Sequence, residues 1–255
     1  MTTYFYSIIF AHIYLEDESL TAKQIKLLAI EGSLDISATL DAYSLVTYAK
    51  TESYIHDTII NAIQFLAQTV GHYIQARSNV NTSKTVIISE SSDVMLIASR
   101  MQSTILEVTS GRTIRVDESS MRATDQAYRG DNVHVTDSNI SGQSSSFQSQ
   151  QDIGIDRSNI IGKQATHQAG KDIRVDESNI QVTDQAYRGD NVYVTDSNIS
   201  GQSSSFQSQQ DIGIVRSSII DEQITNQAGR DLRVTDLYLY IILLHLYRIH
   251  TIKKP

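Results

Sequence analysis

The chain contains no cysteine among its 255 residues. Disulfide bonds, thiolate metal sites and cysteine nucleophiles are therefore excluded together. An excess of positive charge is also missing, because 21 Lys and Arg residues face 29 Asp and Glu residues and the formal net charge is −8. The basic residues lie among acids, as Arg157 lies beside Asp156. Nucleic-acid binding, which needs a basic stripe, is not expected.

Long hydrophobic runs are missing as well. The apolar segment Tyr4 to Leu15 has no Lys or Arg before it and an acidic run, residues 16 to 18, after it, so we do not interpret it as a signal peptide. Residues 237 to 247 form an apolar run of 11 residues, and a membrane-spanning helix needs roughly 20. We expect hydrophobic caps or edges of a truncated reading frame at both ends. The alternative is contact with a membrane surface through Tyr238, Tyr240, Leu243 and Leu244.

Motifs that carry chemistry are missing too: there is no glycine-rich calcium repeat, phosphate loop, dinucleotide fingerprint or Gly-x-Ser-x-Gly elbow. No two histidines stand at metal-ligand spacing with a carboxylate partner. The seven histidines are His12, His56, His72, His134, His167, His245 and His250. Acids such as Asp117, Glu118, Asp176 and Glu177 could act as acid and base or bind calcium, but a solvated corner explains them more simply. We predict no enzyme activity, cofactor or metal.

What the chain does contain is a tandem repeat. Residues 117–175 and 176–234 are two copies of one block, identical at 46 of 59 positions. Each block consists of three shorter copies, separated by steps of 19 or 20 residues. The shorter copies begin at Ile114, Val133, Ile153, Ile173, Val192, Ile212 and Leu232. This period is typical of one rung of a solenoid.

Within a rung the inward residues recur at spacings of two, three and two, as in Val133, Val135, Ser138 and Ile140. The first pair predicts a short strand with one buried face, the odd step a corner, and the last pair a second strand. β-branched residues at these sites and the lack of a 3.6-residue period argue against a helical repeat. We predict an all-β fold, a right-handed parallel β-helix with rungs of about 20 residues.

Stacked rungs place like residues over one another at about 4.8 Å. The aliphatic ladder expected from this register is Val116, Val135, Ile155, Val175, Val194, Ile214 and Val234. The hydroxyl ladder is Ser119, Ser138, Ser158, Ser178, Ser197 and Ser217, with Asn139, Asn159, Asn179 and Asn198 beside it. We interpret all three ladders as structural.

Glycine and small polar residues fill the rest of each rung. A Gly-x-Asp/Asn corner precedes several rungs, and we expect its glycine to supply a positive φ. These glycines are Gly130, Gly170, Gly189 and Gly229. The polar tract of residues 141–151 is copied without change at 200–210. We expect it to form the third side of the rung, with Phe147 and Phe206 stacked as its only large apolar groups.

The first hundred residues fit the pattern less well. Counting back in steps of 20 from Ile114 reaches Val94, and then Ile74, Tyr54 and Leu34. However, residues 57–77 also read as a capped helix, with apolar residues at helical spacing. Those residues are Ile59, Ile63, Leu66, Val70 and Tyr73. Favouring the helix, we predict a helical or mixed N-terminal cap, or irregular early rungs, in residues 1–83. A solenoid array follows in residues 84–236, and a hydrophobic tail or cap in residues 237–255. We expect the first boundary near residues 79–84.

Two sequence segments at the starts of rungs resemble the roughly 20-residue repeats of filamentous haemagglutinins and contact-dependent inhibition exoproteins. The segments are residues 169–175 (AGKDIRV) and 228–234 (AGRDLRV). The resemblance covers about residues 94–236 and suggests a short fragment or a shortened relative. Those proteins are secreted bacterial β-helix stalks. The resemblance implies adhesion or display of a distal activity, two-partner secretion through an outer-membrane pore, and a secreted or cell-surface location.

We therefore predict a structural, adhesive solenoid segment that contacts a host or neighbouring-cell receptor or glycan. The outward residues expected to make contact are Arg115, His134, Arg174, Tyr193 and Arg233. End-to-end self-association is a related prediction, because an open end exposes unpaired strand edges. The alternatives are a polysaccharide-binding or polysaccharide-cleaving β-helix, and a self-assembling filament or an ice-binding solenoid. Ice binding ranks last because Thr136 and Thr195 alternate with Asp and Val instead of forming a regular threonine ladder.

Overall fold

A computed structural model describes residues 4–9, 11–236 and 238–244. Every regular element among these residues is a β-strand, so none of them forms a helix long and apolar enough to cross a membrane. Within each part of the chain the strands pair in parallel and wind into a right-handed solenoid with about 20 residues per turn. The predicted fold class is confirmed.

The chain divides into two compact units, residues 1–130 and 131–255, which are described separately. The strands of unit 1 are β1 (Tyr4–Ile9), β2 (Ile13–Ala29), β3 (Leu34–Ala49), β4 (Glu52–His56), β5 (Ile59–Thr69), β6 (His72–Ala76), β7 (Asn79–Ser89), β8 (Val94–Ile97), β9 (Arg100–Ser110), β10 (Thr113–Asp117) and β11 (Ser120–Gly130).

Unit 2 holds the greater part of the duplicated sequence. Its strands are β12 (Asn132–Thr136), β13 (Asn139–Ser141), β14 (Ser144–Ser149), β15 (Ile153–Asp156), β16 (Asn159–Ala169), β17 (Asp172–Asp176), β18 (Asn179–Gly189), β19 (Asn191–Thr195), β20 (Asn198–Ser200), β21 (Ser203–Ser208), β22 (Asp211–Val215), β23 (Ser218–Ala228), β24 (Asp231–Thr235) and β25 (Tyr238–Leu244).

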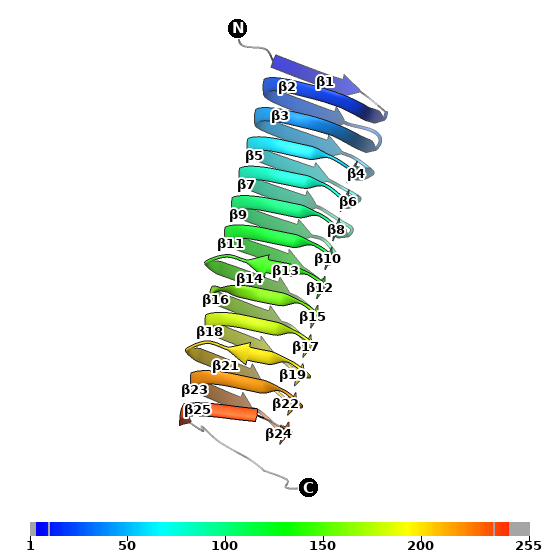
Figure 1. Cartoon of the computed structure of the whole chain (residues 1–255). Coiled ribbons are helices and arrows are strands. Elements are labelled where there is room, and N and C mark those ends of the chain that lie inside the picture. The colour runs from blue at the N-terminus through cyan, green and yellow to red at the C-terminus, as the bar shows by residue number, and fades with distance from the viewer. Residues whose placement is uncertain (1–3, 10, 237, 245–255) are drawn as a thin grey trace. The chain divides into compact units, whose positions relative to one another are not determined.

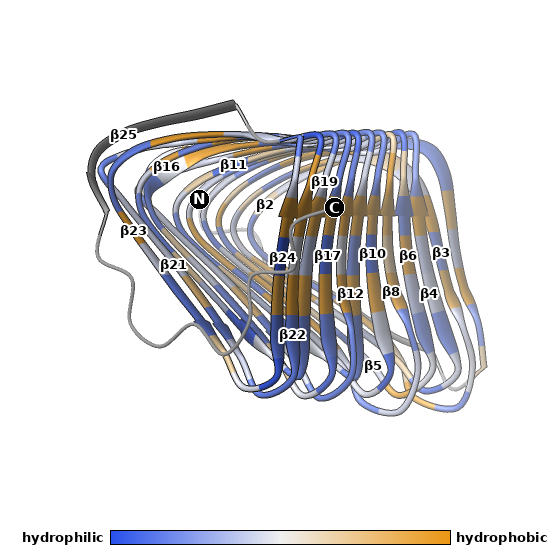
Figure 2. Ribbon diagram, turned by 90° about the horizontal axis from the view of Figure 1, so that it is seen from below, coloured by the Kyte–Doolittle hydropathy of each residue, from blue (hydrophilic) through white to orange (hydrophobic). Residues whose placement is uncertain are grey.

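A typical rung is one short strand followed by one long, bent strand. In unit 2, short β17 pairs with β15 and β19, while long β16 pairs with β18 (Figure 1). Figure 2 looks along the stack: β17, β19 and β24 form one side, and long strands such as β16 and β23 turn around the others. In two rungs the long strand is broken in the middle, giving β13 with β14 and β20 with β21. The short strands therefore form one regular parallel sheet in the unit.

The core of each unit is built from the inward residues of these strands. In unit 2 the aliphatic residues at one inward position lie in register and are at most 1% exposed. They are Val135, Ile155, Val175, Val194 and Ile214. In unit 1, Val116 is buried opposite Leu96. Val234 continues the ladder in register but is 41% exposed, so it contributes less to the core than its position predicted.

A continuous hydrogen-bonded hydroxyl ladder runs beside this core. The Ser158 N–H donates to Ser178 Oγ (3.1 Å), and the Ser178 N–H donates to Ser197 Oγ (3.1 Å). Each hydroxyl in turn donates to the carbonyl two residues earlier, as Ser178 Oγ does to Asp176 O (2.7 Å). Ser138 and Ser217 extend the ladder in unit 2, and Thr58, Ser78, Ser99 and Ser119 repeat it in unit 1. The side chain therefore satisfies backbone groups that a corner would leave unpaired.

The residue before each of these hydroxyl residues has a left-handed backbone and is not glycine, and Asp17 and Asp236 have the same backbone conformation without a hydroxyl residue after them. The φ angles lie between 44° and 53°. These residues are Asp17, Asp57, Arg77, Ala98 and Glu118 in unit 1, and Asp137, Arg157, Glu177, Asp196, Arg216 and Asp236 in unit 2. Most of them are charged. In two pairs of unit 2, Arg157 with Asp137 and Arg216 with Asp196, the guanidinium donates two hydrogen bonds to the carboxylate of the preceding rung.

The role predicted for the glycines is wrong, because no glycine has a positive φ. Close packing requires Gly170, Gly189 and Gly229 instead. A Cβ atom on Gly170 would lie 2.0 Å from the carbonyl oxygen of Gln150, and one on Gly229 would lie 1.9 Å from that of Gln209. Neighbouring rungs therefore approach each other too closely at these turns for any side chain.

The helix predicted over residues 57–77 is also wrong, since this segment forms β5 and β6 of two ordinary rungs. The buried residues of β5 are Ile60, Phe65, Ala67 and Thr69. Ile59 and Ile63, two of the proposed helix face, are each 45% exposed. The apolar residues of the proposed helix face therefore have helical spacing by chance, because they lie on different sides of a bent strand.

The register of the early rungs differs by one residue from that predicted by counting back from Ile114 in steps of 20 residues. Val94 lies opposite Tyr73 rather than Ile74, and Tyr73 lies opposite Ser53 rather than Tyr54. One rung is therefore 21 residues long, and because alternate residues of a strand face opposite sides, this shift buries Tyr73 and Ser53 instead. The boundary expected near residues 79–84 lies inside β7.

The apolar ends of the chain are described only in part. Residues 238–244 form β25, which pairs with β23, and residues 4–9 form β1, which pairs with β2. The remainder of the predicted tail, residue 237 and residues 245–255, lies outside the described residues. Contact of these segments with a membrane stays a prediction.

Candidate functional site

The five predicted contact residues all lie on the outer face of the short strands. Four of them belong to one column of unit 2, in which each residue is the register partner of the next. In chain order the column is His134, Gly154, Arg174, Tyr193, Gly213 and Arg233. Arg115 lies on β10 of unit 1, opposite Met95. We call the unit 2 column and the two outward columns beside it the short-strand face.

Both rings of this column pack onto a glycine of the next rung. A Cβ atom on Gly213 would lie 3.0 Å from Cδ1 of the Tyr193 ring, and one on Gly154 would lie 2.9 Å from Nδ1 of His134. Any larger residue would push the ring away. The glycines therefore let each ring lie close against the sheet, where it offers a surface to solvent.

The first flanking column consists of acids and amides that link successive rungs. The Asp172 N–H donates to Asp152 Oδ1 (3.1 Å), and Asn191 Nδ2 donates to Asp172 Oδ1 (2.8 Å). Asp211 continues the pattern through its N–H to Asn191 Oδ1 (3.2 Å). Arg174 Nη2 donates to Asp172 Oδ2 at 3.1 Å, so its charge is locally balanced. This column holds the outward residues in fixed positions.

The second flanking column consists of Thr136, Asp156, Asp176, Thr195, Val215 and Thr235. Beyond it lies the charged corner, which contains the residues with left-handed backbone. Arg157 donates through Nε and Nη2 to the two oxygens of Asp137, each at 2.9 Å, and Nη1 lies 2.5 Å from Asp156 Oδ2. The bond to the guanidinium of Arg157 keeps the pKa of the Asp137 carboxyl below its usual range. The pKa of the Asp196 carboxyl is lowered in the same way by its hydrogen bonds from Arg216. Because these groups are exposed, solvent screens them and they add little stability.

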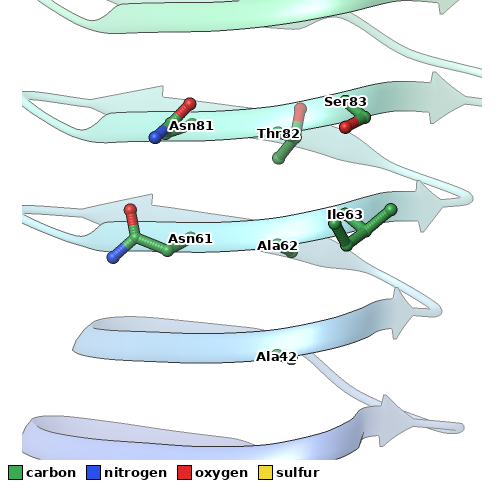
Figure 3. Close-up of a pocket in the computed structure, with 7 residues that line it drawn as sticks. All are labelled: Ala42, Asn61, Ala62, Ile63, Asn81, Thr82 and Ser83. Carbon is green, nitrogen blue, oxygen red and sulfur yellow. The ribbon is translucent and has the colours of Figure 1, made fainter.

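Unit 1 has a shallow depression of about 370 Å³ on its outer surface. It crosses three successive rungs, and its lining residues are Ala42, Asn61, Ala62, Ile63, Asn81, Thr82 and Ser83 (Figure 3). Asn61 Nδ2 donates to Asp41 Oδ1 (2.7 Å), and the hydroxyls of Thr82 and Thr85 are 2.6 Å apart. The depression is lined by amides, hydroxyls and apolar groups rather than by carboxylates and arginines.

One cluster of unit 1 resembles a catalytic triad in composition only. Ser92 Oγ lies 3.0 Å from Nδ1 and 3.1 Å from Nε2 of His72, and Asp93 Oδ2 lies 3.6 Å from Nδ1. Because the two nitrogens flank Cε1, an oxygen equidistant from both lies over the ring face, not along a nitrogen lone pair. The hydroxyl therefore lacks the geometry of a nucleophile activated by a base.

The interior of unit 2 contains a stack of four rings that the sequence pattern did not reveal. Phe147, His167, Tyr187 and Phe206 are stacked nearly parallel, with successive centroids 5.0, 4.6 and 4.9 Å apart. Phe147 and Phe206 are thus separated by two further rings, contrary to the direct stack predicted. Burial lowers the pKa of His167 to about 4, and an interaction with the backbone of Ala186 opposes this shift only in part. Neither ring nitrogen has a well-oriented hydrogen-bond partner, so His167 is a packing residue.

The residues described by the structure include no group of three or more His, Cys, Asp or Glu side chains arranged to hold a metal ion. The features that sequence reasoning missed at the short-strand face are Gly154 and Gly213. A signal was present: each is the outward glycine of an Ile-Gly-Ile strand and follows a ring-bearing strand by one rung. Only the register shows that ring and glycine meet.

These features define a parallel β-solenoid that carries a repeated surface column of rings, glycines and arginines. Residues 74–232 match the model of a family described as a protein of unknown function (DUF3737), and because the match covers more than half of the chain, the chain belongs to that family. No curated protein and no solved structure shows significant similarity to the chain.

Proposed function

We propose that this protein is a structural, adhesive solenoid segment that works at the cell surface or after secretion, and that the short-strand face of unit 2 makes the contact. The observation that supports this proposal is the outward column in which Tyr193 and His134 lie against glycines with arginines in neighbouring rungs. A rigid ring held against a sheet offers contact area at little entropic cost. Arg174, 70% exposed at its side chain, adds a hydrogen-bond donor beside the ring.

Binding accounts for the surface better than cleavage does. Hydrolysis of a polysaccharide uses two carboxyl groups that flank one bond in a groove. The depression of unit 1 is lined by Asn61, Asn81 and small residues, while Asp152 and Asp172 of the short-strand face are engaged in links between rungs. The polysaccharide-cleaving alternative therefore ranks below adhesion.

The test is binding of the full-length chain to bacterial and animal cells and to an array of immobilised glycans. We expect the double variant His134→Ala/Tyr193→Ala to lose at least tenfold in affinity, because both ring surfaces are removed while the core is unchanged. The matched control is Tyr43→Ala, which removes a 58% exposed tyrosine from unit 1. Equal binding by the double variant and the control would contradict the proposal, and so would the absence of binding to every surface.

A further inference from the structure

We infer that the short-strand face carries two equivalent binding patches for one linear, neutral polysaccharide that runs along the solenoid axis. Patch A consists of His134, Gly154 and Arg174, and patch B of Tyr193, Gly213 and Arg233. This inference rests on the proposed function, since it names the class of molecule that the face contacts.

The spacing of the two patches follows from the register. Each member of patch B lies 59 residues after its counterpart in patch A, and the pairings place it three rungs further along unit 2. Rungs are separated by about 4.8 Å, so the patches repeat at roughly 14 Å. Both patches lie within one unit, and the sheet between them fixes their separation.

A polysaccharide fits this spacing. The rung separation of about 4.8 Å is close to the length that one β-linked pyranose unit adds to an extended chain, so about three sugars reach from one patch to the next. The face of an aromatic ring is negative, and it attracts the C–H groups on the face of a pyranose. Each ring would hold one sugar, and the arginine of the same patch would donate hydrogen bonds to the hydroxyls of another.

The charge of the face indicates a neutral chain. The columns that flank the patches carry six carboxyl groups, those of Asp152, Asp156, Asp172, Asp176, Asp211 and Asp231. Three of these acids are engaged in ion pairs: Asp172 with Arg174, Asp156 with Arg157, and Asp211 with Arg230. The other three, Asp152, Asp176 and Asp231, outnumber the one further arginine of the patches, Arg233. An acidic polysaccharide would meet this excess of negative charge and be repelled. A chain of neutral hexoses carries only hydroxyls and meets no such penalty.

Two fixed patches should make binding depend steeply on ligand length. An oligosaccharide that reaches only one patch binds with the affinity of that patch. One that spans both gains from the high effective concentration of its second half, which can raise affinity by about 10² to 10⁴. The gain should vanish when either patch is removed.

The experiment is calorimetric titration of the full-length chain with β-1,4-linked glucose oligosaccharides of about three and about six units, the lengths that reach one patch and both. We expect the longer ligand to bind at least about 100-fold more tightly than the shorter one. Tyr193→Ala should reduce this ratio to below about tenfold, and His134→Ala should do the same. The control variant Tyr43→Ala should keep the full ratio, and uronic acid oligosaccharides of both lengths should bind at least tenfold more weakly than their neutral counterparts.

Several outcomes would overturn the inference: equal affinity for the two lengths, a ratio unchanged by Tyr193→Ala, or tighter binding of the acidic oligosaccharides. If no oligosaccharide binds while attachment to cells still depends on His134 and Tyr193, the inference fails and the proposed function stands. If attachment to cells is also insensitive to both residues, the proposed function fails with it.

Discussion

At the residue scale, the most demanding position of a rung is the corner with left-handed backbone. An L-residue other than glycine pays roughly 1–2 kcal/mol in this conformation. Three pairs of corner residues form ion pairs between neighbouring rungs, Arg77 with Asp57, Arg157 with Asp137 and Arg216 with Asp196, and these offset a small part of this cost. Ala98 has a φ of 46° and only a methyl group to offer. It is therefore the corner at which strain has the least compensation.

We expect Ala98→Gly to stabilise unit 1 by about 0.5–1 kcal/mol, because relief of the left-handed strain exceeds the added entropy of the unfolded chain. The matched control is Ala127→Gly in the middle of β11, which should cost about 0.5–1 kcal/mol. Urea denaturation of the two variants measures both changes. Destabilisation of similar size in both would mean that the corner is not strained.

His167 makes unit 2 sensitive to mild acid. Its pKa falls from 6.5 in the unfolded chain to about 4 in the buried ring stack. Between these values the unfolded chain takes up a proton that the folded chain does not, so stability rises with pH across this window and is complete above it. Acidification from pH 7 to pH 4 should cost about 3 kcal/mol through this residue.

Replacement His167→Phe should remove that part of the pH dependence, since phenylalanine can occupy the same place between Phe147 and Tyr187. Chemical denaturation at several pH values between 4 and 7 compares the two proteins. We expect the difference in unfolding free energy between variant and parent to grow as the pH falls. A constant difference would show that His167 is protonated in the folded state or exposed.

At the element scale, the turn between β16 and β17 depends on the absence of a side chain at Gly170. Gly170→Ala would place a Cβ atom 2.0 Å from the Gln150 carbonyl oxygen, which belongs to the backbone of the preceding rung. We expect a loss of about 1–3 kcal/mol. The control is Gly213→Ala, whose Cβ would meet the side chain of Tyr193 at 3.0 Å and could displace it at smaller cost. The denaturation midpoints measure both, and a smaller loss for Gly170→Ala than for Gly213→Ala would contradict the packing described.

The strands from Val94 onward could be predicted from the sequence because each rung there repeats the same spacing of inward residues. The earlier rungs could not, because insertion of one residue between Tyr73 and Val94 breaks the count and turns the other face of the strand inward. Outward positions such as Arg174 and Tyr193 followed from alternation with buried neighbours. The contact between Tyr193 and Gly213 did not, since it joins residues 20 apart and exists only in the correct register.

At the scale of the whole molecule, a solenoid unit is held together by contacts between neighbouring rungs, so damage at one rung should spread through the stack. Val175→Asp would bury an unpaired carboxylate at a site that is 1% exposed, which should cost about 4 kcal/mol or more. Arg174→Asp changes the outer face of the same strand and should cost about 1 kcal/mol at most. Thermal melting followed by circular dichroism should therefore show loss of β signal for Val175→Asp only. Equal tolerance of the two changes would rule out the stacked core.

The register of the rungs supports both the core and the binding face, and the lack of native cysteine allows it to be measured directly. Arg174 and Tyr193 are register partners on neighbouring strands, about 4.8 Å apart, within the range that a disulfide bridges. The pair Arg174 and Thr195 is diagonal, roughly 8 Å apart, and beyond that range. We predict that the double variant Arg174→Cys/Tyr193→Cys forms an intramolecular disulfide rapidly on oxidation, while Arg174→Cys/Thr195→Cys does not. Failure of the first pair, or equal oxidation of both, would contradict the stacked register.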